Sequence, residues 1–432
     1  MSSETGAALA GNGGKRVLTP ELRFPEFRNE EAWQVHTGDA LFDQINDRNT
    51  QLGLPLLAIT QEHGAIPRHL IDYHVSVTDK SIESYKVVRV GDFIISLRSF
   101  QGGIEYSRYD GICSPAYVIL RLRGEGSEEY FRHYLKTDRF IRILTKNLEG
   151  LRDGKMISYA QFSELLLPVP TPTEQQKIAD CLNSVDELMA AQARKVEALM
   201  THKKGLMQLL FPREGETQPR LRFPEFQDAR EWVETPLSEL CDIKHGYAFE
   251  GEFFRSEGEY VLLTPGNFYE AGGYRDQGAK QKYYVGEIPR DYLLSRGDLL
   301  VAMTEQAAGL LGSPILVPES NRFLHNQRLG LVTRKSGVEW ANEFFFHVFN
   351  TQSVRMEIQA SAAGAKVRHT SPTKIGDVVV SCPASLSEQQ RIADCLAGLD
   401  EIIGDNTQKL DTLKEHKKGL MQQLFPSTEE AP

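Results

Sequence analysis

The feature that most constrains this chain is an internal duplication of about 200 residues. The sequence LRFPEF starts at Leu22 and again at Leu221, and a tryptophan follows each copy at the same distance, at Trp33 and Trp232. These copies lie 199 residues apart. A period of this length, present only twice, is too long for a solenoid repeat and predicts a duplicated domain with pseudo-twofold symmetry.

A second set of repeated segments follows each copy. EQQKIADCL and EQQRIADCL begin at Glu174 and Glu388, and HKKGLMQLLFP and HKKGLMQQLFP begin at His202 and His416. Both pairs lie 214 residues apart, so the spacing rises between the first motif and these segments and then stays constant. The repeating unit is therefore a variable domain followed by a constant segment.

The constant segments are predicted to be long helices. Prolines flank each one, and we expect Ser/Thr-x-x-Gln capping boxes with Thr173 and Ser387 as the capping residues. Mainly apolar residues recur with the 4-3-4-3 spacing of a coiled-coil seam. The seam positions are Ile178, Leu182, Val185, Met189, Gln192, Val196, Leu199, Lys203, Leu206 and Leu210 in the first helix, and Ile392, Leu396, Leu399, Ile403, Asn406, Leu410, Leu413, Lys417, Leu420 and Leu424 in the second. The polar members fall at equivalent places, which favours a paired coiled coil over two helices packed separately on their own domains.

A helix of this length is a rod of roughly 55 Å, at about 1.5 Å per residue. Pairing about a twofold axis perpendicular to the rod is antiparallel and would hold the variable domains at opposite ends. The helix pair would then act as a ruler.

Composition limits the function classes. Lys and Arg total 49 against 59 Asp and Glu, a formal charge of -10, which argues against a generally polybasic nucleic-acid binder and leaves only local basic patches. Five cysteines without a CxxC pair favour free thiols in a reducing compartment. The sequence shows neither an 18-residue apolar run nor a signal peptide, so we expect a cytoplasmic protein without membrane contact.

The predicted fold class is α+β. We expect a mobile tail (1–20), a first compact domain (21–172), a helix (173–212), a linker (213–220), a second compact domain (221–386), a second helix (387–426) and a short tail (427–432).

Basic residues gather at two kinds of place. Residues 130–148 are predicted to form one helix with a cationic face opposite an apolar face, followed by a glycine-rich basic loop, and a similar loop lies 214 residues later. The candidate phosphate contacts are Arg132, Lys136, Arg139, Arg152, Lys155, Lys366, Arg368 and His369. An ordinary solvated helix face explains the stripe about equally well.

Several polar clusters contain side chains able to bond base edges. These candidates are Gln61, His63, Arg98, Ser99 and Gln101 in the first domain, and Tyr247, Asn267, Asn326, Gln327 and Arg328 in the second.

The sequence offers no credible catalytic centre. The loop Gly150 to Lys155 lacks the spacing and hydroxyl residue of a P-loop. Ser114-Pro115-Ala116-Tyr117 only superficially resembles an amino-methyltransferase motif and is better explained as a turn that opens a strand. The histidines have no partnering cysteines, which argues against zinc.

The duplicated helices, the LRFPEF openings and segments such as GAKVRHTSP (364–372) and LHNQRL (324–329) resemble the specificity subunits of type I restriction-modification systems. The resemblance implies two target-recognition domains of α/β type separated by an antiparallel two-helix coiled coil. Each domain would read one half of a bipartite double-stranded DNA site, and the helices would set the spacer. It also implies a non-catalytic subunit that docks two methyltransferase subunits, which an ATP-dependent restriction subunit can join. S-adenosylmethionine, ATP and magnesium are then expected in the partner subunits and no cofactor in this chain.

Two alternatives from other classes stay open. One is a methyltransferase or nuclease with fused recognition domains, against which the missing cofactor motifs argue. The other is a coiled-coil adaptor that does not bind DNA.

Overall fold

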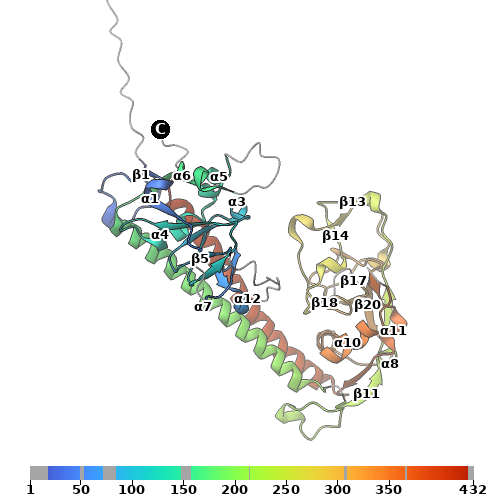
Figure 1. The fold of residues 1–432 in the computed structure, drawn as a ribbon. Helices are drawn as coiled ribbons and strands as arrows, with labels where there is room; N and C mark the ends of the chain where they lie inside the picture. The colour runs from blue at the N-terminus through green and yellow to red at the C-terminus, as the bar shows by residue number, and fades with distance from the viewer. Residues whose placement is uncertain are drawn as a thin grey trace, which may run out of the picture. The chain divides into compact units, whose positions relative to one another are not determined.

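The computed structural model describes residues 18–48, 53–71, 84–146, 157–213, 215–305, 309–364 and 367–426 (Figure 1). The chain divides into two compact units. One consists of Met1–Ala193 together with Gln408–Pro432, and the other is Arg194–Thr407. Residues 408–426 therefore belong to the same unit as the first domain. The expected tails fall mostly outside the described residues, but Leu18 is buried in the core of the first unit.

The first unit is built on an antiparallel sheet in the strand order β2-β9-β6-β7. These strands are β2 (Phe42–Ile45), β9 (Val118–Leu122), β6 (Phe93–Ile95) and β7 (Glu105–Tyr106). Two-stranded pairs join β1 (Gln34–Thr37) to β10 (Leu166–Val169), β3 (Leu57–Thr60) to β4 (Gly64–Pro67), and β5 (Lys86–Val88) to β8 (Gly111–Cys113). The short helices are α1 (Gly38–Leu41), α3 (Ser99–Gly102), α4 (Glu128–Tyr134), α5 (Asp138–Lys146) and α6 (Tyr159–Ser163), with 3-10 turns η1 (Pro25–Phe27) and η2 (Arg68–Leu70).

The second unit has a central antiparallel sheet in the order β12-β20-β16-β18. Its strands are β12 (Cys241–His245), β20 (Leu329–Arg334), β16 (Leu299–Ala302) and β18 (Pro314–Leu316). A further sheet contains β13 (Phe254–Arg255), β15 (Tyr283–Tyr284), β14 (Tyr260–Leu262) and β19 (Phe323–Leu324), and β11 (Val233–Pro236) pairs with β22 (Val379–Cys382) and β17 (Thr304–Glu305) with β21 (Arg368–His369). The short helices are α8 (Leu237–Leu240), α9 (Asn342–Phe349), α10 (Gln352–Ala360) and α11 (Pro372–Gly376), with 3-10 turns η3 (Pro224–Phe226), η4 (Gly251–Phe253), η5 (Pro265–Asn267), η6 (Gly278–Lys280) and η7 (Arg290–Tyr292).

The two units share one design. Their central sheets have the same strand order, and in both the first strand pairs with the strand that directly precedes the long helix, β1 with β10 and β11 with β22. The central strands β6 and β16 are buried and read as short apolar runs, FII and LLVA, as expected for strands covered on both faces. The predicted α+β fold with an internal duplication is confirmed.

The constant segments form the helices α7 (Pro172–Leu210) and α12 (Leu386–Leu424). In the first unit, Leu182 of α7 shares a core with Leu424 of α12. Asp186, four residues later in α7, pairs at 2.5 Å with Lys417, which lies seven residues earlier in α12. The second unit repeats this opposite progression: Leu210 shares a core with Leu396, and seven residues back along α7 Lys203 pairs with Asp400, four residues further along α12. Within each unit the two helices therefore run antiparallel. Every predicted seam position is buried or half-buried, which confirms the heptad assignment.

Both helix starts lie earlier than predicted. Thr171 and Ser385 are the capping residues: their Oγ atoms accept hydrogen bonds of 3.4 Å from the backbone N–H groups of Glu174 and Glu388. The expected caps Thr173 and Ser387 lie inside the first turn. Pro172 explains the shift in α7, because proline is well tolerated at the first helical position, where its missing N–H has no partner to lose.

Each unit completes its core with the C-terminal end of a long helix. In the first unit, Phe425 is fully buried, with its ring centroid 5.5 Å from that of Tyr130 and 5.6 Å from that of Tyr134. In the second, Phe211 stacks on Phe344 at 5.5 Å. The LFP ends of the duplicated helices are thus core segments.

The LRFPEF motif is a clamp on the helix starts. Arg222 donates two hydrogen bonds of 2.7 Å to the buried carboxylate of Glu388, and Trp232 Nε1 donates a third at 3.1 Å. In the first unit, Arg23 donates two bonds of 2.8 Å to the equally buried Glu174. The arginine of each LRFPEF copy therefore holds its domain to the helix that follows it.

The prediction of a single helix over residues 130–148 is wrong. The segment forms α4 and α5 with a break at residues 135–137, because Thr137 Oγ1 accepts a hydrogen bond from Phe140 N at 3.1 Å and starts a new helix. The apolar side predicted for this segment is buried at Tyr130, Tyr134, Phe140 and Leu144. Residues 147–156, including the predicted basic loop with Arg152 and Lys155, lie outside the described residues.

Candidate nucleic-acid interface

Two candidate clusters of the first unit meet in space. Gln61 lies in the turn between β3 and β4, and its Nε2 donates to the backbone oxygen of Arg98 at 3.3 Å, just before α3. The side chains of Gln61, His63, Arg98 and Gln101 are exposed. Ser99 is buried instead, where its Oγ accepts from Ser96 N at 2.8 Å and shapes the turn. The fold thus turns two separate sequence clusters into one polar surface.

A glycine makes the β3–β4 turn possible. Gly64 has φ +67°, and a Cβ there would lie 2.8 Å from the backbone oxygen of Tyr106 on the neighbouring strand β7. Only glycine fits both the left-handed backbone and this close approach. The position of Gln61 and His63 is therefore set by backbone packing.

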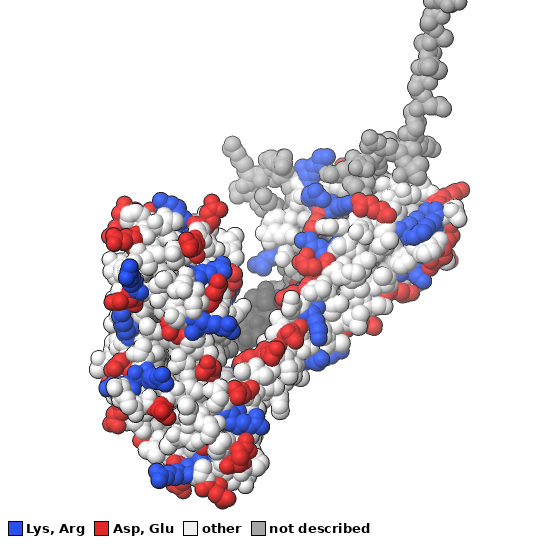
Figure 2. Space-filling view, turned by 180° about the vertical axis from the view of Figure 1, so that it is seen from behind, with Lys and Arg blue, Asp and Glu red and all other residues white. Residues whose placement is uncertain are grey.

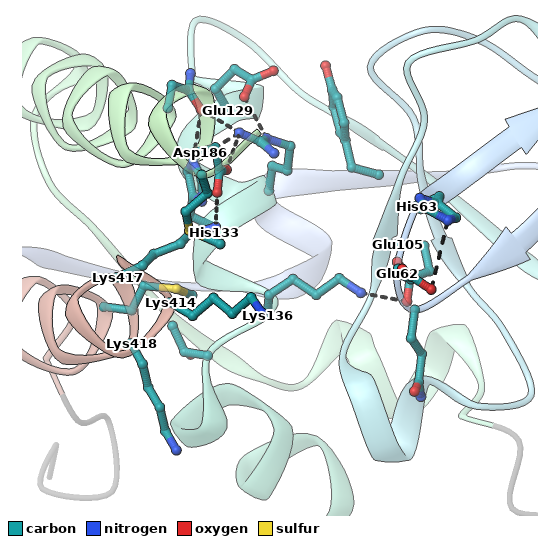
Figure 3. A pocket seen from close by; sticks show the side chains of 18 of the residues that line it. Glu62, His63, Glu105, Glu129, His133, Lys136, Asp186, Lys414, Lys417 and Lys418 are labelled. Atoms are coloured by element: carbon teal, nitrogen blue, oxygen red, sulfur yellow. Dashed lines mark hydrogen bonds and ion pairs between the residues drawn. The ribbon is translucent and has the colours of Figure 1, made fainter. Parts of the chain in front are cut away.

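This surface borders a groove of about 1450 Å³ that continues along α4, α5 and the first unit's parts of α7 and α12. Figure 3 shows His63, Glu62 and Glu105 on one side of it and Lys414, Lys417 and Lys418 of α12 on the other. Arg132, Lys136 and Arg139 also line the groove.

The three predicted phosphate contacts of the helical stripe already have partners within the fold. Arg132 pairs with Glu129 at 2.6 Å and Asp186 at 3.4 Å. Lys136 reaches the buried Glu105 at 2.5 Å; burial raises the pKa of the Glu105 carboxyl and lowers the pKa of the Lys136 ammonium (Figure 3). Arg139 donates to the backbone oxygen of Phe425 at 2.7 Å. Much of this stripe's hydrogen-bonding capacity is used to hold helices together.

Two exposed cations of the groove, Lys414 and Lys418, were not among the predicted site residues. A heptad count places both outside the seam, where solvated lysines are common. The signal that could have found them is the local density of cations in KEHKK (414–418). On the face drawn in Figure 2, Lys and Arg are interspersed with Asp and Glu, in keeping with a chain whose cations are not in excess.

A buried histidine stands at the same place in each unit. His133 on α4 shares a 2.9 Å hydrogen bond with Asn183 Oδ1 of α7, and burial, with the nearby Arg132 charge, lowers its pKa to about 3. His347 on α9, 214 residues later, also has its pKa lowered to about 3, by burial and then by the charge of Lys203. Both imidazoles are neutral at pH 7.

In the second unit, Tyr247 and the segment 325–328 come together. Tyr247 N donates to His325 O and Gln327 N donates to Tyr247 O, each at 2.9 Å. Tyr247, Gln327 and Arg328 are exposed, whereas Asn326 is largely buried and accepts from Arg328 N at 3.1 Å. Two further predicted segments are thus joined into one surface.

The remaining candidates of this unit differ in exposure. Arg368 pairs with the buried Glu305 at 3.0 Å, and Glu305 also accepts from the N–H groups of Gly309, Leu310 and Leu311. His369 is exposed on β21, and Lys366 lies outside the described residues. Asn267 is fully buried, where it bonds Thr264 and Gln281, so its amide supports a turn.

No three His, Cys, Asp or Glu side chains among the described residues are grouped as metal ligands. None of the helices in the described part of the chain combines the length and apolar character that a membrane span needs.

Residues 229–415 match the family model described as "Type I restriction modification DNA specificity domain". The chain is 23% identical over 355 residues to the type I restriction enzyme MjaVIII specificity subunit of Methanocaldococcus jannaschii, covering 81% of each chain. It is 22% identical over 418 residues to the putative MjaX specificity subunit of the same organism, covering 91% of this chain and 93% of the relative.

Two solved structures have a similar fold. The S subunit of a type I restriction-modification system from M. genitalium superposes with a TM-score of 0.54 at 16% identity, over 95% of this chain and 99% of that chain. A chain from a structural study of complex assembly and conformational transition in the type I R-M system gives 0.53 at 16% identity, over 91% and 97%.

Proposed function

We propose that this chain, a specificity subunit of the type I restriction-modification class, recognises a bipartite DNA sequence, with one half read by each unit. The observation that carries the proposal is the duplicated fold with unlike polar surfaces. The central sheets have the same strand order, but the exposed side chains differ: Gln61, His63, Arg98 and Gln101 in one unit, and Tyr247, Gln327, Arg328 and His369 in the other. Equivalent frameworks with different surfaces suit the recognition of two unlike half-sites.

The helices are proposed to set the distance between the half-sites. Their continuous heptads and the two interhelical ion pairs, Asp186 with Lys417 and Lys203 with Asp400, favour one fixed register. The domain boundaries predicted from the sequence belong to this proposal, with residues 21–172 and 221–386 as the two recognition domains.

Phosphate contacts are proposed for the groove of the first unit. The exposed Lys414 and Lys418 lie on its helical side. Phosphate contact stays a prediction for Arg132, Lys136 and Arg139. It also stays a prediction for three residues outside the described part of the chain, Arg152, Lys155 and Lys366. A chain with a charge of -10 would gain from partner subunits that supply further positive surface.

Specificity subunits are the DNA-recognition components of their systems. We propose that this one is not itself an enzyme, and that it docks two methyltransferase subunits and joins an ATP-dependent restriction subunit. S-adenosylmethionine, ATP and magnesium would then act in those partners. The MjaVIII and MjaX relatives, named as specificity subunits, are matched over at least 81% of their length, which favours a separate subunit over a fused methyltransferase or nuclease.

Sequencing of methylated sites tests the proposal. The chain is co-expressed with its methyltransferase partner in cells that lack other adenine methylation. We expect one split motif with two unlike halves and a fixed spacer. Methylation by the purified chain alone would instead indicate a fused enzyme, and a complex without salt-dependent DNA binding would indicate an adaptor.

A further inference from the structure

A closed turn leads into strand β20 of the second unit. Leu329 N donates to Asn326 O at 3.0 Å, which makes Gln327 and Arg328 the two central residues of a four-residue β-turn. Both side chains are exposed. Among the described residues, neither side chain takes part in a hydrogen bond or ion pair. The turn therefore presents an amide and a guanidinium with their donors available.

The stem of this turn is held rigidly. His325 is fully buried, and its Nε2 donates to Leu329 O at 2.9 Å across the base of the turn. A Cβ on Gly246 would lie 2.1 Å from Asn326 O, so the backbone at Gly246 lies directly against the turn. Tyr247 adds the two backbone hydrogen bonds described above. Because the stem is rigid, the backbone of the turn loses little entropy when its side chains bind.

The equivalent turn of the first unit presents different chemistry. It leads into β9, which occupies the same place in its sheet as β20, and it is closed by Tyr117 N donating to Ser114 O at 3.1 Å. This confirms that 114–117 is a turn that opens a strand. Its central residues are Pro115 and Ala116, whose side chains have no hydrogen-bonding group.

We propose that the turn of Gln327 and Arg328 reads base edges for the second domain. This proposal rests on the proposed function. Arginine bonds guanine O6 and N7 in a bidentate way, and glutamine bonds adenine N6 and N7. The half-site read by this domain therefore contains a G·C pair next to an A·T pair. The matching Pro-Ala turn reads no base, so the first domain reads its half-site from the surface around Gln61 and Arg98.

The experiment sequences methylated sites from cells that express the methyltransferase partner with the wild-type chain or a variant. Arg328→Ala is expected to reduce discrimination at one guanine position of one half-site by roughly ten- to a hundred-fold. Arg328→Lys should relax the same position, because lysine keeps the charge but loses the bidentate fork. Gln327→Ala should relax the adjacent adenine position. Arg334→Ala is the matched control at the far end of β20 and should leave the motif unchanged.

The outcomes distinguish base reading by this turn from the proposed function itself. Motifs that stay unchanged in all variants would overturn base reading by this turn. Weaker methylation of every site with the motif intact would also overturn it, because that result identifies a phosphate contact. A relaxed position that is not a G·C pair in the Arg328 variants, or not an A·T pair in Gln327→Ala, would overturn the assigned bases. If the wild-type complex gives no split motif, the proposed function itself fails. Thermal unfolding of each variant, expected to match the wild type at these exposed positions, excludes a folding defect as the cause.

Discussion

Arg222→Ala is the most informative test of how the repeated LRFPEF motif holds the fold. The wild-type guanidinium donates two hydrogen bonds of 2.7 Å to Glu388, whose side chain is 1% exposed, and also bonds the backbone oxygens of Ala229 and Arg230. Removing it leaves a buried carboxylate with the Trp232 indole and the helix start as its remaining support. Breaking one partner from a buried ion pair costs about 3–5 kcal/mol.

The assay is hydrogen exchange of the second unit's amides, followed by mass spectrometry in increasing urea, because it reports the two units separately. Arg230→Ala is the control, since that exposed residue uses its backbone oxygen and not its side chain in the clamp. The double replacement Arg222→Met with Glu388→Met should recover most of the loss, as it removes the uncompensated charge. A loss below about 1 kcal/mol for Arg222→Ala would refute the clamp and reduce the motif to a surface contact.

Further predictions address spacing, turn geometry and pH. Deleting a matched heptad from the middle of each helix (residues 191–197 and 406–412) should shorten the rod by ~10 Å and select a spacer about three base pairs shorter in methylation sequencing; an unchanged spacer would refute the ruler. Gly246→Ala should displace the neighbouring turn and weaken discrimination in one half-site only, whereas equal loss in both halves would mean global damage. The folded-state pKa of His347 is about 3, against an ordinary value of 6.5. The unfolded chain therefore binds a proton below pH 6.5 that the folded chain does not bind. The free energy of unfolding should fall by about 2 kcal/mol between pH 6.5 and 5. Urea titrations of His347→Leu should therefore show a flatter pH dependence than the wild type, and an unchanged slope would contradict the assignment.

Periodicity predicted the long helices well because seam burial depends only on local spacing. It could not place their starts, since Pro172 and Leu386 are both acceptable first-turn residues and the choice is made by the Oγ of Thr171 and Ser385, each one residue earlier. The break after α4 was missed for a similar reason. Thr137 fits a helix interior by pattern, and only its hydrogen bonds show that it starts a new one.

The sequence predicted which segments contain candidate DNA contacts, but it did not predict which of these segments lie together on one surface. Sequence could not show that Gln61 meets Arg98, or that Tyr247 meets Gln327, because these contacts depend on strand pairing between distant segments. Nor could it show that Asn267 faces inward, since residue type alone does not decide whether an amide supports a turn or contacts a ligand.

The burial of Phe425 among the aromatic residues of the first unit also sets an order of folding during synthesis. The core of the second unit contains Phe211, which the ribosome makes before most of that unit. This core can therefore close as soon as the remaining residues of the unit emerge. The first unit depends on Leu424 and Phe425, which are made only after the whole of the second unit. The domain translated first is therefore the domain that finishes folding last, and a nonsense mutation at Leu424 would damage this N-terminal domain while leaving the core of the second unit intact.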